Sequence, residues 1–171
     1  MALVRNAYGT YRSACADDTI ELGRALGACL QEGDVLVLTG DLGAGKTQLT
    51  KGAADALGYD GPVTSPTFNI QNVYDGAHMP LYHFDLYRLE DPDQLGDAGL
   101  LDALGEEDGA CLIEWGEAFA QVIGDERVDV LLRRLDDEAA VGEEPPREIR
   151  FQPHGPRAEE LVAALDARFA R

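Results

Sequence analysis

Gly40-Asp41-Leu42-Gly43-Ala44-Gly45-Lys46-Thr47 satisfies the phosphate-loop pattern G-x-x-x-x-G-K-[ST], and this motif indicates the fold class. The aliphatic run 35–38 precedes it and is typical of a strand buried on both faces of a parallel sheet. Residues 46–57, which follow it, favour a helix. In such a strand–loop–helix unit, glycines let backbone N–H groups surround a phosphate, and the helix N-terminus adds positive potential. This context disfavours the alternative, a glycine-rich turn with an incidental lysine.

Three side chains are candidates for binding the phosphate that this loop holds or the metal ion that accompanies it. Lys46 is predicted to bridge the β- and γ-phosphates, and Thr47 to offer its hydroxyl to Mg²⁺. Glu114 directly follows the apolar run 110–113, and the end of a core strand is where a phosphate-loop enzyme places the acid that holds the metal or its waters. A surface carboxylate at a strand end is the alternative interpretation of Glu114.

Two further segments are candidates for sensing the γ-phosphate. The loop Thr64-Ser65-Pro66-Thr67-Phe68 gathers three hydroxyls soon after the helix, where NTPases often place a switch; a simple turn is the alternative. Strand alternation puts His83, Asp85 and Tyr87 on one face, where Asp85 is placed to orient water or to act on the metal's ligands. The pattern is equally compatible with Asp85 as a cross-strand partner of an arginine such as Arg88.

The charge balance limits the partners that this chain can bind directly. There are 14 Lys+Arg against 32 Asp+Glu, so the formal net charge is −18. Nucleic-acid binding draws its affinity from neutralising phosphates with Lys and Arg. The acidic surface of this protein repels such phosphates. We therefore expect no direct DNA binding, and if the protein serves RNA, a partner holds the RNA.

Length and cysteine usage favour an ordinary globular protein. The 171 residues suit one domain spanning 1–171. The N-terminal residues lack the apolar stretch of a signal peptide, and the aliphatic runs are far too short to cross a membrane, so we expect a cytoplasmic protein without membrane contact. Cys15, Cys29 and Cys111 show no C-x-x-C spacing and are expected to be small buried hydrophobes.

The remaining pattern predicts an α/β fold: a P-loop NTPase-like, mainly parallel sheet with an antiparallel hairpin and flanking helices. Besides the strand–loop–helix unit, the expected elements are helix 18–31, hairpin strands 67–74 and 81–87, short helices at Pro92 and 99–104, core strand 110–113, strand 128–135, an acidic loop at 136–146, strand 147–151 and an amphipathic helix from Arg157.

The sequence disfavours guanine as the base of the nucleotide. Guanine is recognised through N-K-x-D, and neither Lys46 nor Lys51, the two lysines of the chain, follows an asparagine. Asp102 begins a D-x-x-G match, but no apolar strand leads into it, so we attribute this match to chance.

Four motifs, taken in this order and spacing, resemble the bacterial TsaE (YjeE) family. They are the phosphate loop 40–47, Ser65-Pro66-Thr67-Phe68, Tyr82-His83-Phe84-Asp85-Leu86-Tyr87-Arg88-Leu89 and Ile113-Glu114-Trp115. The resemblance covers roughly residues 30–120, and the phrase His-Phe-Asp-Leu-Tyr-Arg is its most specific part.

The resemblance implies an Mg²⁺-dependent ATPase that acts with the TsaD and TsaB proteins. They make threonylcarbamoyladenosine in tRNAs that decode ANN codons; hydrolysis resets the partner complex, and tRNA is met only through that complex. The same resemblance assigns ATP binding to Gly40, Leu42, Gly43, Ala44, Gly45, Lys46, Thr47 and, after the acidic loop, Arg147. It assigns Mg²⁺ to Thr47 and Glu114, and hydrolysis to Lys46, Asp85 and Glu114. Two other functions stay open: a nucleotide-gated binding module that needs no hydrolysis, and a small-molecule kinase.

Overall fold

A computed structural model describes residues 3–41, 43–66, 70–91, 93–94, 99–106 and 108–169. In chain order the elements are β1 (Val4–Ala7), β2 (Thr10–Ser13), α1 (Ala16–Cys29), β3 (Val35–Thr39), α2 (Lys46–Ala56), β4 (Gln71–Asp75), β5 (Pro80–Asp85), α4 (Leu100–Glu106), β6 (Ala110–Glu114), η1 (Glu117–Phe119), α5 (Ala120–Ile123), β7 (Arg127–Arg134), η2 (Asp136–Glu138), β8 (Arg147–His154) and α6 (Pro156–Ala167).

The described strands form one 8-stranded sheet in the order β1-β2-β8-β7-β3-β6-β5-β4. Its centre is parallel, because β7, β3, β6 and β5 all run the same way, while β1, β2 and β8 on one side and β4 on the other are antiparallel to their neighbours. The predicted α/β fold with a P-loop-type parallel core and an antiparallel β4–β5 hairpin is thereby confirmed. The sheet as a whole is mixed, with antiparallel edges.

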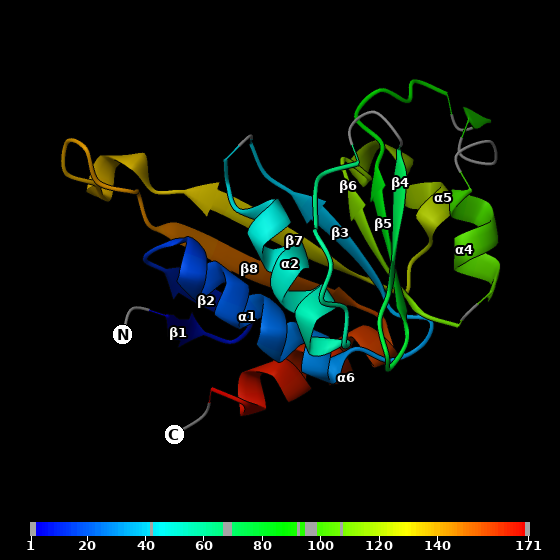
Figure 1. Ribbon diagram of the computed structural model, residues 1–171, viewed down its shortest axis with the longest axis horizontal. Coiled ribbons are helices and arrows are strands. Elements are labelled where there is room, and N and C mark those ends of the chain that lie inside the picture. The colour runs from blue at the N-terminus through cyan, green and yellow to red at the C-terminus, as the bar shows by residue number, and fades with distance from the viewer. Residues whose placement is uncertain are drawn as a thin grey trace.

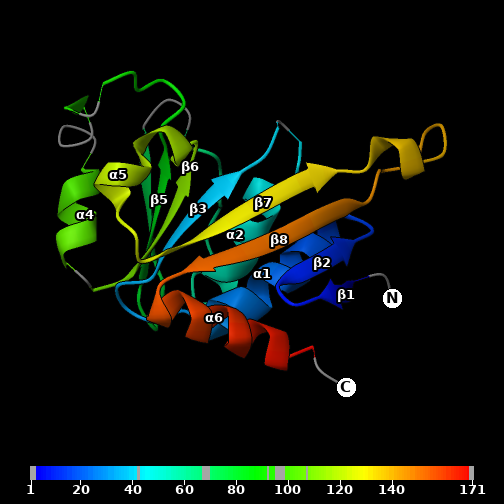
Figure 2. The same cartoon turned by 180° about the vertical axis from the view of Figure 1, so that it is seen from behind.

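Helices cover the two faces of the sheet unequally. In Figure 1, α1 and α2 lie side by side in front of the central strands, and in Figure 2, α4 and α5 lie on the opposite face beside β5 and β6. The helix α6 packs against β8 and α1. The strands β7 and β8 form a long hairpin, and the acidic loop that joins them projects past the sheet at the side of the molecule where the phosphate loop also lies (Figure 1).

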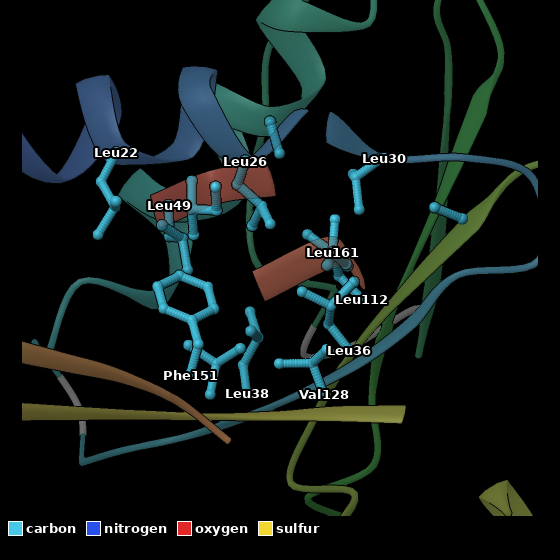
Figure 3. Close-up of a cluster of buried hydrophobic side chains, with 14 of the residues drawn as sticks. Leu22, Leu26, Leu30, Leu36, Leu38, Leu49, Leu112, Val128, Phe151 and Leu161 are labelled. Carbon is cyan, nitrogen blue, oxygen red and sulfur yellow. The ribbon is translucent and has the colours of Figure 1, made fainter. Parts of the chain in front are cut away.

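The larger core lies between the sheet and the helices α1, α2 and α6. Leu22 and Leu26 of α1 and Leu49 of α2 face Leu36 and Leu38 of β3, all without solvent exposure (Figure 3). A smaller core on the other face packs Val37 and Ile113 of the central strands against α4, η1 and α5. The strands β3 and β6 thus bury side chains on both faces, as their continuous aliphatic runs predict.

The sequence-based expectations were wrong at the N-terminal end. No strands were expected there, yet β1 and β2 form an antiparallel edge pair, and β2 pairs with β8. The first helix begins at Ala16, two residues before the expected start, because the backbone N–H of Thr19 already donates to the Cys15 carbonyl at 3.2 Å. The helix expected at Pro92 and the strand residues 67–69 lie outside the described residues.

Two glycines bring the backbones of α1 and α2 into direct contact. A Cβ on Gly23 would lie 2.2 Å from the carbonyl oxygen of Leu49, and one on Gly52 would lie 2.0 Å from the carbonyl oxygen of Ile20. Both distances are far below van der Waals contact, so the crossing requires a residue without a side chain on each helix. This contact fixes α2, which carries the phosphate loop at its N-terminus, against α1.

None of the described helices is both long and apolar enough to span a lipid bilayer.

Replacing Gly52 by alanine tests the helix contact. In an exposed helix this change stabilises by about 0.5–1 kcal/mol. Here the new Cβ meets backbone, so we expect Gly52→Ala to lower the free energy of unfolding by roughly 1–3 kcal/mol or more. The urea midpoint at constant m-value measures the change, and a midpoint equal to or above that of the parent protein would contradict the close contact.

The thiol of Cys111 offers a second test of the core. Burial, reinforced by the nearby Asp108, raises the pKa of Cys111 to about 12. Since the thiolate is the reactive form, the side chain stays protonated and inert at pH 8. We expect a thiol reagent to label Cys15, which is partly exposed, before Cys111, which reacts only on unfolding. Equal labelling rates of the two in the folded protein, followed by peptide mass spectrometry, would argue against this packing.

Candidate functional site

The candidate residues converge at one edge of the sheet, where the parallel strands end. Asp85 is the last residue of β5 and Glu114 the last of β6, and the two are paired in register. Leu38, next to the end of β3, is paired with Glu114 from the other side. Because parallel strands bring their carboxyl ends to the same edge, side chains far apart in the sequence meet there.

The phosphate loop leaves β3 at this edge and opens α2. Gly43 and Gly45 adopt φ values of 80° and 105°, in the region that favours glycine. A backbone hydrogen bond of 3.1 Å from Ala44 N–H to the Asp41 carbonyl closes the turn. Leu42 lies outside the described residues. The loop thus has the glycine-dependent curvature that a phosphate cradle requires.

The side chain of Lys46 folds back across the loop and is only 6% exposed. Its Nζ donates to the Gly40 carbonyl at 2.7 Å, lies 3.8 Å from Glu114 Oε1 and sits 4.4 Å from the centre of the Trp115 ring. Trp115 has φ 59°, an unusual value for a residue other than glycine. A cation is therefore held at the mouth of the loop by a carbonyl, a carboxylate and an aromatic face.

Glu114 is a buried carboxylate with partners on both oxygens. Its side chain is 3% exposed, Oε1 faces Lys46, and Oε2 lies 2.6 Å from Nε2 of the fully buried His83. A carboxylate oxygen accepts, so the hydrogen in that short bond sits on Nε2. The other ring nitrogen, Nδ1, lies 3.0 Å from the hydroxyl of Tyr74. Burial raises the pKa of Tyr74, which keeps that hydroxyl protonated.

Asp85 connects the strand ends to the loop before β4. Its Oδ1 accepts from the Tyr87 backbone N–H at 3.0 Å, and its Oδ2 accepts from Ser65 Oγ at 3.3 Å. Asp85 is 6% exposed. The Ser-Pro-Thr loop is thus in contact with the candidate acid through Ser65, while Thr67 lies outside the described residues.

Arg147 reaches the phosphate loop from the hairpin formed by β7 and β8. It starts β8, and its guanidinium donates to the Gly43 carbonyl at 3.1 Å, to Glu144 at 2.7 Å and to the Pro145 carbonyl at 2.9 Å. Its Nε is buried and has no hydrogen-bond partner among the described residues. A buried donor without an acceptor, beside a phosphate loop, suits an anionic ligand.

A cavity of about 910 Å³, within the range of small-molecule sites, lies between the phosphate loop and the ends of β5 and β6. Its lining includes Lys46, Thr47, Asp85, Glu114 and Trp115. The described residues contain no cluster of three His, Cys, Asp or Glu that could hold a metal alone. Mg²⁺ needs no such cluster, since it is usually bound through one or two side chains together with phosphates, so the oxygen ligands here fit it.

Lys46, Thr47, Asp85 and Glu114, each predicted separately, are brought together in this cavity, and Arg147 is brought to the loop at Gly43. The D-x-x-G match at Asp102 is not part of it: Asp102 is exposed on α4, which packs on the opposite face of the sheet from α2.

Sequence reasoning missed the buried partners of Glu114. His83 was placed on the correct strand face, but its bond to Glu114 depends on the parallel register of β5 and β6. Tyr74 was seen only as part of a strand, and its contact with His83 depends on the β4–β5 hairpin register. The available signal was the position of His83 on the same strand face as the candidate acid Asp85.

Three comparisons relate this chain to known proteins. The family model described as "Threonylcarbamoyl adenosine biosynthesis protein TsaE" matches residues 13–141. The tRNA threonylcarbamoyladenosine biosynthesis protein TsaE of Bacillus subtilis (strain 168) is 39% identical over 155 residues, which cover 91% of this chain and 92% of the relative. The protein of the same name from Treponema pallidum (strain Nichols) is 42% identical over 125 residues, which cover 73% of this chain and 91% of the relative. The crystal structure of Bacillus subtilis YdiB aligns with a TM-score of 0.74 at 33% identity, over 94% of this chain and 95% of that chain.

The parallel core, the glycine loop at its edge and the helix that the loop opens define a P-loop α/β protein. Within that class, the chain belongs to the TsaE family, as its similarity along most of its length shows.

Proposed function

We propose that this chain is a single-domain ATPase that supports threonylcarbamoyladenosine modification of ANN-decoding tRNA together with the TsaB and TsaD proteins. The observation that carries the proposal is the meeting of Lys46, Thr47, Asp85 and Glu114 in one cavity at the end of the parallel strands. The names of the relatives supply the pathway.

Each residue has a defined task in the proposed reaction. Lys46 and the backbone N–H groups of the loop bind phosphate oxygens, and Arg147, held against the same loop, adds positive charge. Thr47 and Glu114 are the proposed Mg²⁺ ligands; when bound, the metal neutralises charge that develops on the phosphates. Asp85, oriented by Ser65 and the Tyr87 N–H, positions the attacking water.

The acidity of the chain supports an indirect role toward RNA. With a net charge of −18, the protein gains nothing from contact with a phosphate backbone. A partner complex that itself binds tRNA removes this difficulty, since only a protein–protein contact and ATP are then needed.

Two substitutions separate binding from turnover. Lys46→Ala is expected to abolish ATP binding, because it removes the buried cation that faces the phosphate loop. Asp85→Asn is expected to leave ATP affinity within about twofold but to lower turnover by about 100-fold, the usual contribution of a positioned acid or base. Fluorescence titration and phosphate release measure the two quantities. Asp102→Asn, an exposed acid in the D-x-x-G match, is the control and is expected to change neither; unchanged hydrolysis in both site variants would refute the mechanism.

Partner dependence tests the pathway. We expect slow ATP hydrolysis by the purified chain with Mg²⁺ and faster hydrolysis when a TsaB–TsaD pair and tRNA are added, with no stimulation in Lys46→Ala. Turnover that ignores the pair but rises with an acceptor metabolite would support a kinase instead. Normal modification by Asp85→Asn with bound ATP would support a nucleotide-gated binding module.

A further inference from the structure

A line of hydrogen bonds runs beneath the cavity, from the loop before β4 to the acid at the end of β6. The hydroxyl of Tyr74 lies 3.0 Å from the Thr64 carbonyl and 3.0 Å from His83 Nδ1, and His83 Nε2 lies 2.6 Å from Glu114 Oε2. Tyr74, His83 and Glu114 are at most 3% exposed. The line therefore crosses the interior without water between its members.

Simple core packing does not account for this arrangement. A buried polar side chain costs free energy unless it is hydrogen-bonded, and an apolar residue of similar size avoids that cost. Here one end of the line is Glu114, whose other oxygen faces Lys46 at 3.8 Å. The other end is Thr64, and its neighbour Ser65 donates to Asp85 at 3.3 Å. The loop is thus bonded directly to Asp85. It is connected to the second candidate acid, Glu114, through the side chains of Tyr74 and His83.

The proton count of Tyr74 makes the line responsive to the loop. A tyrosine hydroxyl has a single hydrogen, so it donates either to the Thr64 carbonyl or to His83 Nδ1, but not to both at once. While Thr64 is in place, the hydroxyl can donate to its carbonyl, and a withdrawal of Thr64 would free the hydrogen for His83 Nδ1. The position of the loop thereby determines the bond on one side of the imidazole, and the ring's other nitrogen holds Glu114.

We propose that Tyr74 and His83 form a positioning relay that orients the Glu114 carboxylate toward Lys46 and the metal ligand Thr47 in response to the position of the loop at Thr64. This inference rests on the proposed ATPase function. In it, His83 and Tyr74 act through Glu114 and touch neither nucleotide nor water. Partners of this kind behind a metal ligand typically alter metal affinity or activity by about 10–100-fold when they are removed.

The geometry is tested first without nucleotide, by ¹⁵N NMR of the three histidines in the full chain. We expect the Nε2–H of His83 to be protected from exchange with solvent. Tyr74→Phe should change the ¹⁵N chemical shifts of both ring nitrogens of His83. Tyr59→Phe is the matched control, because the Tyr59 hydroxyl donates to the Pro62 carbonyl of the same loop at 3.1 Å, and its ring packs on Tyr74 at 5.1 Å. A His83 spectrum that Tyr74→Phe leaves unchanged would overturn the relay.

The second test compares His83→Gln with His83→Leu. Glutamine keeps an N–H that can donate to Glu114, whereas leucine only fills space. For His83→Leu we expect ATP affinity without Mg²⁺ to stay within about twofold, the Mg²⁺ enhancement of ATP affinity to fall about tenfold, and kcat to fall about 10–100-fold. His83→Gln should recover most of both losses.

Equal losses in His83→Leu and His83→Gln would mean that His83 only packs the core, and no loss in His83→Leu would mean that it does not act on Glu114; either outcome overturns the proposal. Failure of the ATPase function is distinguishable, because it would appear as absent ATP binding by the unmodified chain. The NMR comparison then decides the relay by itself.

Discussion

The buried carboxylate of Glu114 is the constraint on which the site depends. A negative charge with 3% exposure is tolerated only when both of its oxygens have partners, and two elements besides its own strand supply them. Lys46 comes from the first turn of α2 and His83 from β5. Satisfying one charge thus sets where α2, β5 and β6 stand relative to one another, and the cavity is the space that these contacts leave at the strand ends.

The same contacts place a cation and two acids close together before any ligand is bound. Lys46 is held by Gly40, Glu114 and Trp115, and Asp85 by Ser65 and the Tyr87 N–H. Groups that are already oriented need no reorganisation when charge develops on a substrate, and in enzymes generally this is usually the largest single contribution to catalysis. The membership of the TsaE family and this geometry therefore support one another, although they rest on different observations.

The sequence predicted the features that neighbouring residues form, and it did not predict those that depend on contacts between distant segments. The unit from β3 to α2 was predictable, because an aliphatic run, a glycine loop and a helix follow one another directly. Lys46, Asp85 and Glu114 were predictable singly, since each stands in a motif or at the end of a strand. The strands β1 and β2 were not, because β2 is held by pairing with β8, more than a hundred residues later, and β1 only by pairing with β2. The link from Tyr74 to Glu114 was hidden for the same reason: it exists only once two strand registers are known.

The backbone contact of α1 and α2 gives the cavity one rigid wall. Gly23 and Gly52 leave no side chain at the point where the two helices cross, so the backbones pack directly and α2, with the phosphate loop at its start, is anchored to α1. We therefore expect ligand-dependent changes on the side of the cavity that Ser65 and the 65% exposed Tyr87 line. A partner protein that distinguishes the liganded from the free state would find the difference there.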